Sequence, residues 1–405
     1  MTKLTDKKEI RMFSMLFMLI YFASYITRIN YGAVISEMVR DTGYTKAALA
    51  LALTGSSIGY GIGQIISGGL GDKFQPKYLI ASGFCVTILT NLLIPVCSSP
   101  YQMLVVWSVN GLSQAFLWPP LVRLMSAIFT PKDYSEACVW TNIGSSGGTI
   151  FVYLSAPLFI TLWGWKSVFF VSAFFAMLIL IMWMKKCCLI DSREKQSKTD
   201  TSAQMKTGYK ALFSPIMLAV MLAIIIQGAL RDGITTWMPS YISETYSLST
   251  KISILTNVAL PIFSIVCFQV SERLYRKVFK NPLMCSAAIY GLSVLAAALL
   301  WIFSGGNAVI SVIASALFTG CMHGINLILI CMVPTFFYKY GTVSAATGIL
   351  NSCTYIGSAV STYVIAVISD NYGWNATLGV WFALACAGFV TCLLCVRPWE
   401  HFTKK

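Results

Sequence analysis

Two arginines lie near the middle of long apolar segments and place the strongest chemical constraint on this sequence. Sixteen uncharged residues precede Arg28 and eight follow it, and Arg231 comes directly after the run LAVMLAIIIQGAL. A guanidinium group at the centre of an apolar helix costs at least roughly 2.5–3.5 kcal/mol, so each must face protein or water. Its planar fork of N–H donors can bind two oxygens of a carboxylate or phosphate. The two positions therefore predict anion binding.

An internal ion pair is the alternative, since Asp232 follows Arg231 directly. Successive positions on a helix differ by roughly 100°, so neighbouring side chains point in different directions and this pairing is awkward. We therefore expect both arginines to lack a counter-ion in the protein and to bind one anion together.

Aromatic hydroxyl groups accompany Arg28 at helical spacing. Tyr21 and Tyr25 precede it by seven and three residues and so share its face of the helix. Tyrosine is also common at membrane interfaces, but beside an arginine the pair predicts a substrate cavity with neutral donors and flat walls. Further candidates to line this cavity lie in other apolar segments: Tyr60, Gln64, His323 and Tyr355.

Two of these candidates have other interpretations. His323 can bind the ligand or titrate in proton coupling, or its ring can simply hydrogen-bond backbone carbonyls. Gln64 can line the cavity or bridge two helices.

Composition defines the elements that must position these residues. Of 405 residues, 57% are hydrophobic and only 11% are charged, whereas a soluble fold carries roughly 25% charged residues. The net charge of +14 raises a nucleic-acid binder as another class, but the charges lie in short loops between apolar runs. About 20 apolar residues cross a bilayer as a helix. The predicted fold is an all-α membrane protein with twelve transmembrane helices, near 12–34, 47–70, 79–97, 102–128, 136–160, 167–185, 213–237, 252–271, 282–303, 308–333, 345–368 and 376–396.

Lysine and arginine are distributed unequally between the two sides of these spans. One side carries 23 of the 29 basic residues and the other carries 4, while Arg28 and Arg231 lie within spans. The positive-inside rule places the richer side, and with it both termini, in the cytoplasm. We expect a multi-pass protein of the plasma (inner) membrane.

A polar stretch divides the chain into two halves. Residues 185–210 are rich in Lys, Ser, Thr and Gln, which is typical of a flexible linker. We predict an N-terminal six-helix bundle over 1–190, a cytoplasmic linker over 191–210 and a C-terminal six-helix bundle over 211–405. An arginine in the first span of each half predicts that the bundles are pseudo-symmetric repeats.

A second feature recurs in both halves and predicts a gate. Asp72-Lys73 follow Arg28 by about 44 residues in the segment GGLGDKFQPK, and Glu272-Arg273 follow Arg231 by about 41 residues. Small residues let helix ends approach closely, and an acidic group can accept hydrogen bonds from a neighbouring helix N-terminus. Such contacts can form in one conformation of the protein and break in another. Arg123, after the WPP sequence of span four, is a further candidate gate or anchor.

Several segments resemble the organophosphate:inorganic phosphate antiporters of the major facilitator superfamily. They cover most of the chain: YFASYITRIN, GYGIGQIISGGLGDK, GLSQAFLWPPLVR, ALRDGITTWMPSYI and GILNSCTYIGSAVSTYVI. The resemblance implies two parallel repeats with a site at mid-bilayer. It also implies phosphate binding by Arg28 and Arg231, and a cavity lined by Tyr21, Tyr25, Tyr60 and Tyr355.

Two positions depart from the pattern of glycerol-phosphate carriers in this family. Gln64 stands where they have a lysine, and Gly144 stands where they have a histidine. Losing two donors lowers the positive charge and should open space. The substrate is thus expected to be bulkier, or a monoanion.

The sequence favours secondary active transport of an organic anion, most of all a phosphate ester exchanged for inorganic phosphate by alternating access. The alternative is a proton-coupled symporter of a carboxylated or sulfonated anion, and a ligand sensor with the same fold is a third reading. The scattered cysteines form no metal-binding pattern. We expect no enzyme activity, no cofactor, no metal, no nucleic-acid partner, and a monomer in the lipid bilayer.

Overall fold

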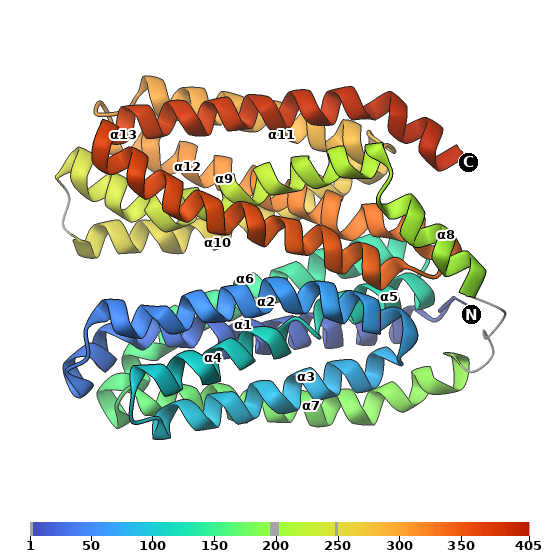
Figure 1. Ribbon diagram of the computed structural model, residues 1–405, viewed down its shortest axis with the longest axis horizontal. Coiled ribbons are helices and arrows are strands. Elements are labelled where there is room, and N and C mark those ends of the chain that lie inside the picture. The colour runs from blue at the N-terminus through green and yellow to red at the C-terminus, as the bar shows by residue number, and fades with distance from the viewer. Residues whose placement is uncertain (1–2, 195–201, 248–249, 405) are drawn as a thin grey trace. The chain divides into compact units, whose positions relative to one another are not determined.

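The computed structural model describes residues 3–194, 202–247 and 250–404, and every regular element in this part of the chain is helical. Figure 1 shows their course. The helices are α1 (Lys7–Thr42), α2 (Lys46–Lys73), α3 (Pro76–Leu93) with the short η1 (Ile94–Val96), α4 (Pro100–Gln114), α5 (Trp118–Ile128), α6 (Pro131–Trp163), α7 (Lys166–Glu194), α8 (Ser202–Leu212), α9 (Pro215–Tyr246), α10 (Thr250–Lys277), α11 (Pro282–Ile302), α12 (Ala308–Asn326), η2 (Leu327–Met332), η3 (Val333–Tyr340) and α13 (Val343–Lys404).

Nine helices in the described part are long and apolar enough to cross a membrane, and the other three of the twelve crossings are the divided α4–α5 pair, α10 and the second part of α13. The fourth crossing is divided into α4 and α5, because Pro119 and Pro120 cannot donate backbone hydrogen bonds to the preceding turn. The last two crossings are joined in α13, where Gly373 adopts φ 76° and ψ 177° and turns the chain. The eighth crossing is α10.

The tenth crossing changes its helical type along its length. After α12 ends at Asn326, the chain continues as the π-helix η2 and then as the 3-10 helix η3. All six η2 residues are buried. Pro334 lies just beyond η2 and lacks a backbone N–H, which is one local reason for the change.

The expected linker is more helical than its composition predicts. The helix α7 continues to Glu194 and α8 begins at Ser202, so most of 185–210 is helical. Residues 195–201, within the predicted linker, lie outside the described residues. Lysine, glutamate and glutamine are good helix formers, which favours extension of α7 beyond its apolar part.

The chain forms two compact units. The first contains Met1–Gly208 together with Phe337–Ile349, and the second contains Tyr209–Phe336 together with Leu350–Lys405. The first unit therefore includes the end of η3 and the first residues of α13.

Within the first unit, helices pack in pairs through close backbone approaches. The main pairs are α1 with α6, α2 with α4, and α3 with α7, and Figure 1 shows α3 running along α7. An added Cβ on Gly111 of α4 would clash with the backbone of Ser56 on α2. Small residues thus set the spacing between these helices, as is typical of membrane bundles.

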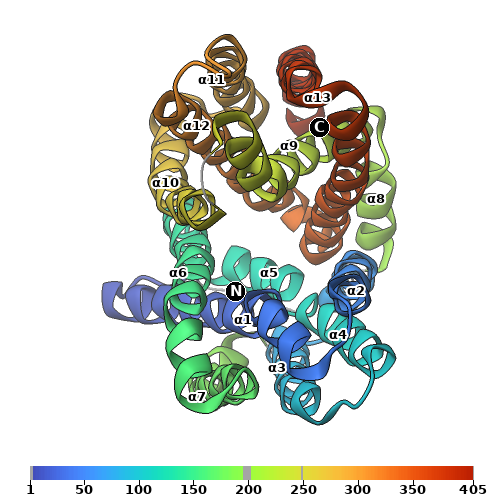
Figure 2. The ribbon, with the colours of Figure 1, turned by 90° about the vertical axis from the view of Figure 1, so that its left-hand side faces the viewer.

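The second unit repeats this pairing. The helix α12 packs against α10 and α11, which lie next to it in Figure 2. An added Cβ on Gly228 of α9 would clash with the backbone of Thr354 on α13. An added Cβ on Gly388, near the end of α13, would clash with the ring of Tyr290 on α11. First with fifth, second with fourth, and third with sixth crossings therefore pair in both halves.

An indole–carboxylate contact also recurs at equivalent places. Asp41 lies thirteen residues after Arg28 and accepts a 2.8 Å hydrogen bond from Nε1 of Trp165. Glu244 lies thirteen residues after Arg231 and accepts a 2.8 Å bond from Nε1 of Trp374. Each tryptophan follows a glycine with φ 76°, a conformation that L side chains rarely adopt. The contact ties the end of the first crossing of each half to the turn between its last two.

We expect Trp165→Phe to lower the stability of the protein. The substitution keeps an aromatic ring against Phe169, which lies 6.0 Å away between centroids, but it removes the indole N–H. A hydrogen bond to a charged group contributes about 1.5 kcal/mol or more. Thermal unfolding of the purified protein measures the loss as a fall in the midpoint of several degrees. Trp163→Phe, at a position 66% exposed, is the matched control. Equal midpoints for the two variants would contradict the assignment.

Candidate functional site

Arg28 on α1 lies between two tyrosine rings of the first unit. Its Cζ atom is 4.5 Å from the ring centroid of Tyr25, one turn earlier on α1, and 4.8 Å from that of Tyr60 on α2. Such cation–π contacts contribute about 0.5–2 kcal/mol, more where water is excluded. Both contacts restrict where the guanidinium can move. The tyrosines thus help to fix the position of Arg28.

A network of buried amides lies next to this arginine. The carbonyl of Thr27 accepts hydrogen bonds from Asn91 on α3 (3.1 Å) and Asn110 on α4 (3.0 Å). Gln114 on α4 donates to the Thr27 hydroxyl at 2.9 Å and to the carbonyl of Ser24 at 3.1 Å. These side chains are essentially inaccessible to solvent. They hold α1 at the level of Arg28, and sequence reasoning did not identify them because single amides carry no motif.

Two other predicted residues belong to the same unit. The ring of Tyr21 contacts that of Trp118 at the start of α5, with centroids 4.9 Å apart, and that of Tyr25 at 6.2 Å. Gln64 on α2 is fully buried, and its amide lies 3.5 Å from the carbonyl of Ala115 at the end of α4. In this structure Gln64 therefore bridges two helices.

Gly144 does not leave the open space expected from the missing histidine. An added Cβ at this position would clash with the backbone oxygen of Met18 on α1. The helix α6 approaches α1 so closely that the room for a side chain is already filled. The expectation that Gly144 opens space for a bulkier substrate is therefore wrong.

Arg231 on α9 has a counter-ion, contrary to expectation. Its Nε donates to Oδ1 of Asp232 at 2.6 Å and its Nη2 donates to Oδ2 at 2.8 Å. Both side chains bend toward each other, so the divergence of neighbouring positions along the helix does not prevent a two-point ion pair. The Arg231 side chain is 14% exposed, and its Cζ lies 5.9 Å from the ring of Tyr355 on α13.

Two more residues of the second unit lie near this ion pair. Ser358, three residues after Tyr355 on α13, hydrogen-bonds the Asp232 carboxylate. His323 on α12 lies near enough to interact electrostatically with both charges, and its ring meets that of Phe268 edge-on at 5.5 Å. The structure thus brings His323, Tyr355 and Arg231 together, and it adds Asp232 and Ser358.

Asp72 at the end of α2 accepts two hydrogen bonds from the first turn of α13. Its Oδ1 and Oδ2 atoms lie 2.8 Å from the backbone nitrogens of Ser344 and Ala345. A carboxylate is favourable at a helix N-terminus, where N–H groups lack partners in the helix. Gly68 permits this approach, since an added Cβ there would lie 2.9 Å from the backbone oxygen of Ser344. All of these residues belong to the first unit.

Arg123 binds the same end of α2. Its Nη1 donates to the carbonyls of Gly71 and, at 2.9 Å, of Phe74. A cation at a helix C-terminus complements the helix dipole. Lys73, between the two carbonyls, is exposed.

The equivalent residues of the second unit are arranged differently. Glu272 on α10 is buried and lies 3.0 Å from Nε of Arg276, one turn later, while Arg273 is exposed. The spacing of four residues brings both side chains to one face of the helix. The acidic residue recurs in both halves, but its interaction does not.

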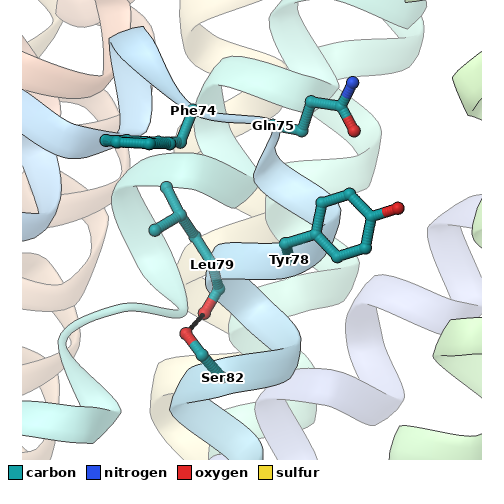
Figure 3. Close-up of a pocket in the computed structure, with 5 residues that line it drawn as sticks. All are labelled: Phe74, Gln75, Tyr78, Leu79 and Ser82. Atoms are coloured by element: carbon teal, nitrogen blue, oxygen red, sulfur yellow. Dashed lines mark hydrogen bonds between the residues drawn. The ribbon is translucent and has the colours of Figure 1, made fainter.

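A surface hollow near the start of α3 has no charged lining. Figure 3 shows its five residues, Phe74, Gln75, Tyr78, Leu79 and Ser82, and the bond of 2.8 Å from the Ser82 hydroxyl to the Leu79 carbonyl. The Phe74 and Tyr78 side chains are 56% and 58% exposed. A hollow of this composition does not fit an anion site. Nor do the described residues contain a group of three or more His, Cys, Asp or Glu side chains that could hold a metal ion.

The fold and the charged positions within its spans define a polytopic helical transporter. Residues 17–346 match the family model described as Major Facilitator Superfamily, which is more than half of the chain. The protein belongs to the Major Facilitator Superfamily, whose members carry solutes across membranes and are not enzymes. It shares this fold with the proton:xylose symporter XylE bound to 6-bromo-6-deoxy-D-glucose, with a TM-score of 0.75, 12% identity, and coverage of 96% and 95% of the two chains.

Curated relatives at low identity span most of the chain. The Glycerol-3-phosphate transporter of Bacillus subtilis (strain 168) is 26% identical, with coverage of 88% of this chain and 85% of its own. A "Probable hexose phosphate transport protein" of Chlamydia muridarum is 23% identical, with coverage of 96% and 90%. The Membrane sensor protein UhpC of Escherichia coli (strain K12) is 21% identical, with coverage of 92% and 88%. These relatives agree with the resemblance to the organophosphate:phosphate antiporter family.

We expect Asp72→Ala to destabilise the protein more than Asp72→Asn. Alanine leaves two buried N–H groups of α13 without their acceptor, at a cost of about 1–3 kcal/mol, whereas asparagine keeps one acceptor oxygen. Thermal unfolding of the purified carrier gives the order. Lys73→Ala, at the exposed neighbouring position, controls for substitution in this turn. If Asp72→Ala melts with the wild type, the carboxylate does not stabilise the start of α13.

Proposed function

We propose that this transporter exchanges an organic phosphate ester for inorganic phosphate. The observation that supports the proposal most directly is the pair of mid-span arginines at equivalent positions of the two halves, each with a tyrosine ring against its guanidinium. Guanidinium forks match phosphate oxygens in shape and charge. The names of the glycerol-phosphate and hexose-phosphate relatives agree with this substrate class.

The proposed site combines Arg28 and Arg231, with Tyr21, Tyr25, Tyr60, Gln64, His323 and Tyr355 as further substrate-binding residues. Among these residues and Asp232, two fixed positive charges stand against one negative charge. Moving a net charge through the low-dielectric interior is costly. A bound anion reduces that charge, and this favours reorientation of the loaded carrier over the empty one. Exchange follows, with an outward gradient of inorganic phosphate as the driving force.

Alternating access in this proposal uses the contacts at the ends of α2 and α10. Asp72, Lys73 and Arg123, with Glu272 and Arg273 in the second half, are proposed as gating residues that form and break contacts between access states. The 23 to 4 distribution of basic residues favours an inner-membrane protein with both termini in the cytoplasm. We propose that the carrier works as a monomer.

The exchange itself is tested in proteoliposomes. Vesicles loaded with phosphate should take up labelled glycerol 3-phosphate or glucose 6-phosphate at least tenfold faster than vesicles loaded with a phosphate-free buffer of the same pH. Uptake that needs no internal phosphate but collapses with a protonophore would favour the proton-coupled symporter, for which Asp232 and His323, both near Arg231, are the candidate titratable groups. Binding without flux would favour a sensor, in line with the name of the UhpC relative.

Arg28→Lys and Arg231→Lys should each reduce exchange by about tenfold or more, although the charge is retained. Lysine is a point charge and cannot offer two parallel N–H donors to a phosphate. Initial rates in vesicles of matched protein content measure the effect. Arg40→Lys, at an exposed position paired with Glu37, is the control and should transport normally. Near-normal exchange by both site variants would remove the arginines from the proposed site.

A further inference from the structure

Asp232 is the one acidic residue near the middle of a predicted span. The other fourteen of the fifteen acidic residues lie toward helix ends or in connecting segments. An ionised carboxylate within a span is as costly as an arginine, and it is tolerated when it is paired. Its location next to Arg231 therefore requires a functional or structural reason.

The geometry of the ion pair restricts how an anion can reach Arg231. Asp232 takes the edge of the guanidinium formed by Nε and Nη2, with bonds of 2.6 and 2.8 Å. An incoming phosphate must approach a different edge or displace the carboxylate. In both cases the Asp232 carboxylate, on the residue next to Arg231, remains close to the bound anion.

Contacts from other helices hold this carboxylate in place. Ser358 on α13 hydrogen-bonds it, and His323 on α12 lies near both charges. With Tyr355 against the guanidinium, the groups that face the pair come from α12 and α13. Asp232 is thus a fixed part of the site and not a side chain that swings freely.

A fixed negative charge affects ligands of different charge unequally. It repels a doubly charged phosphate ester about twice as strongly as a singly charged one, and the low-dielectric surroundings screen this repulsion poorly. It also cancels part of the attraction from Arg231. With the two arginines of the proposed site, Asp232 leaves a net charge of +1, which a singly charged ligand cancels, whereas a doubly charged ligand leaves one negative charge uncompensated in surroundings where an unpaired charge is costly.

We propose that Asp232 is a specificity-determining counter-ion that makes this carrier favour singly charged organic anions, such as a protonated phosphate ester, over doubly charged ones. The inference rests on the proposed function, because it assumes that Arg231 binds the transported anion. It assigns to the substrate a net charge that the proposed function leaves open.

Two ligands of nearly equal shape and different charge test the proposal. Glucose 6-sulfate carries one negative charge at all relevant pH values, and glucose 6-phosphate carries two at pH 8. Calorimetric titration of the purified full-length carrier gives the dissociation constant of each. We expect Asp232→Asn to raise the affinity for the phosphate relative to the sulfate by about tenfold, which is about 1.4 kcal/mol. Asp232→Glu retains the charge and should keep the wild-type ratio. An unchanged ratio in Asp232→Asn would overturn the proposal.

A second measurement needs no variant and covers the case in which Asp232→Asn does not fold. The second pKa of a phosphate ester is about 6, so the phosphate becomes largely singly charged below that pH. Wild-type affinity for glucose 6-phosphate should rise severalfold from pH 8 to pH 5.5, while affinity for glucose 6-sulfate stays constant. Equal changes for both ligands would assign the effect to a protein group such as His323 and overturn the proposal. If the wild type binds neither ligand nor inorganic phosphate, it is the proposed function that fails.

Discussion

The cost of placing a guanidinium group inside an apolar span is the constraint on which this structure depends. The two arginines meet it in different ways. Arg28 lies over the rings of Tyr25 and Tyr60, whereas Arg231 is neutralised by the carboxylate next to it and contacts one ring. Around Arg28, buried amides from α3 and α4 hold the backbone of α1. The position of each charge is thus set by several helices at once, which orients its donors before any ligand arrives.

Duplication explains the shared features of the two halves, and divergence explains their electrostatics. The helix pairs recur, and so do the arginine, the carboxylate thirteen residues after it that accepts from a tryptophan, and the acid at the end of the second crossing. These recurring contacts support the backbone. The binding partners of the acidic residues do not recur. Asp72 binds a helix N-terminus, whereas Glu272 binds Arg276. Each half therefore keeps the same scaffold and carries its own charge arrangement.

Sequence reasoning predicted the helical membrane fold and the grouping of tyrosines with arginines, because hydropathy and helical spacing act locally. Tyr25 lies three residues before Arg28, so one turn brings them together. The Arg231–Asp232 pair was considered but judged unfavourable from helix geometry, because its formation depends on side-chain rotamers and on Ser358, which lies over a hundred residues away. The π-helix at Leu327–Met332 was missed, since no residue in it is forbidden in an α-helix. Long-range packing decides such features.

The two departures from the glycerol-phosphate pattern, together with Asp232, act on charge and not on cavity size. Gln64 replaces a lysine of the glycerol-phosphate carriers and is fully buried against the end of α4. Gly144 replaces a histidine, but the close approach of α1 fills the space that the side chain would occupy. Asp232 adds a negative charge beside Arg231. Because none of the three enlarges a cavity and each lowers the positive charge, we expect the selectivity of the proposed carrier to follow the net charge of its ligand and not ligand volume.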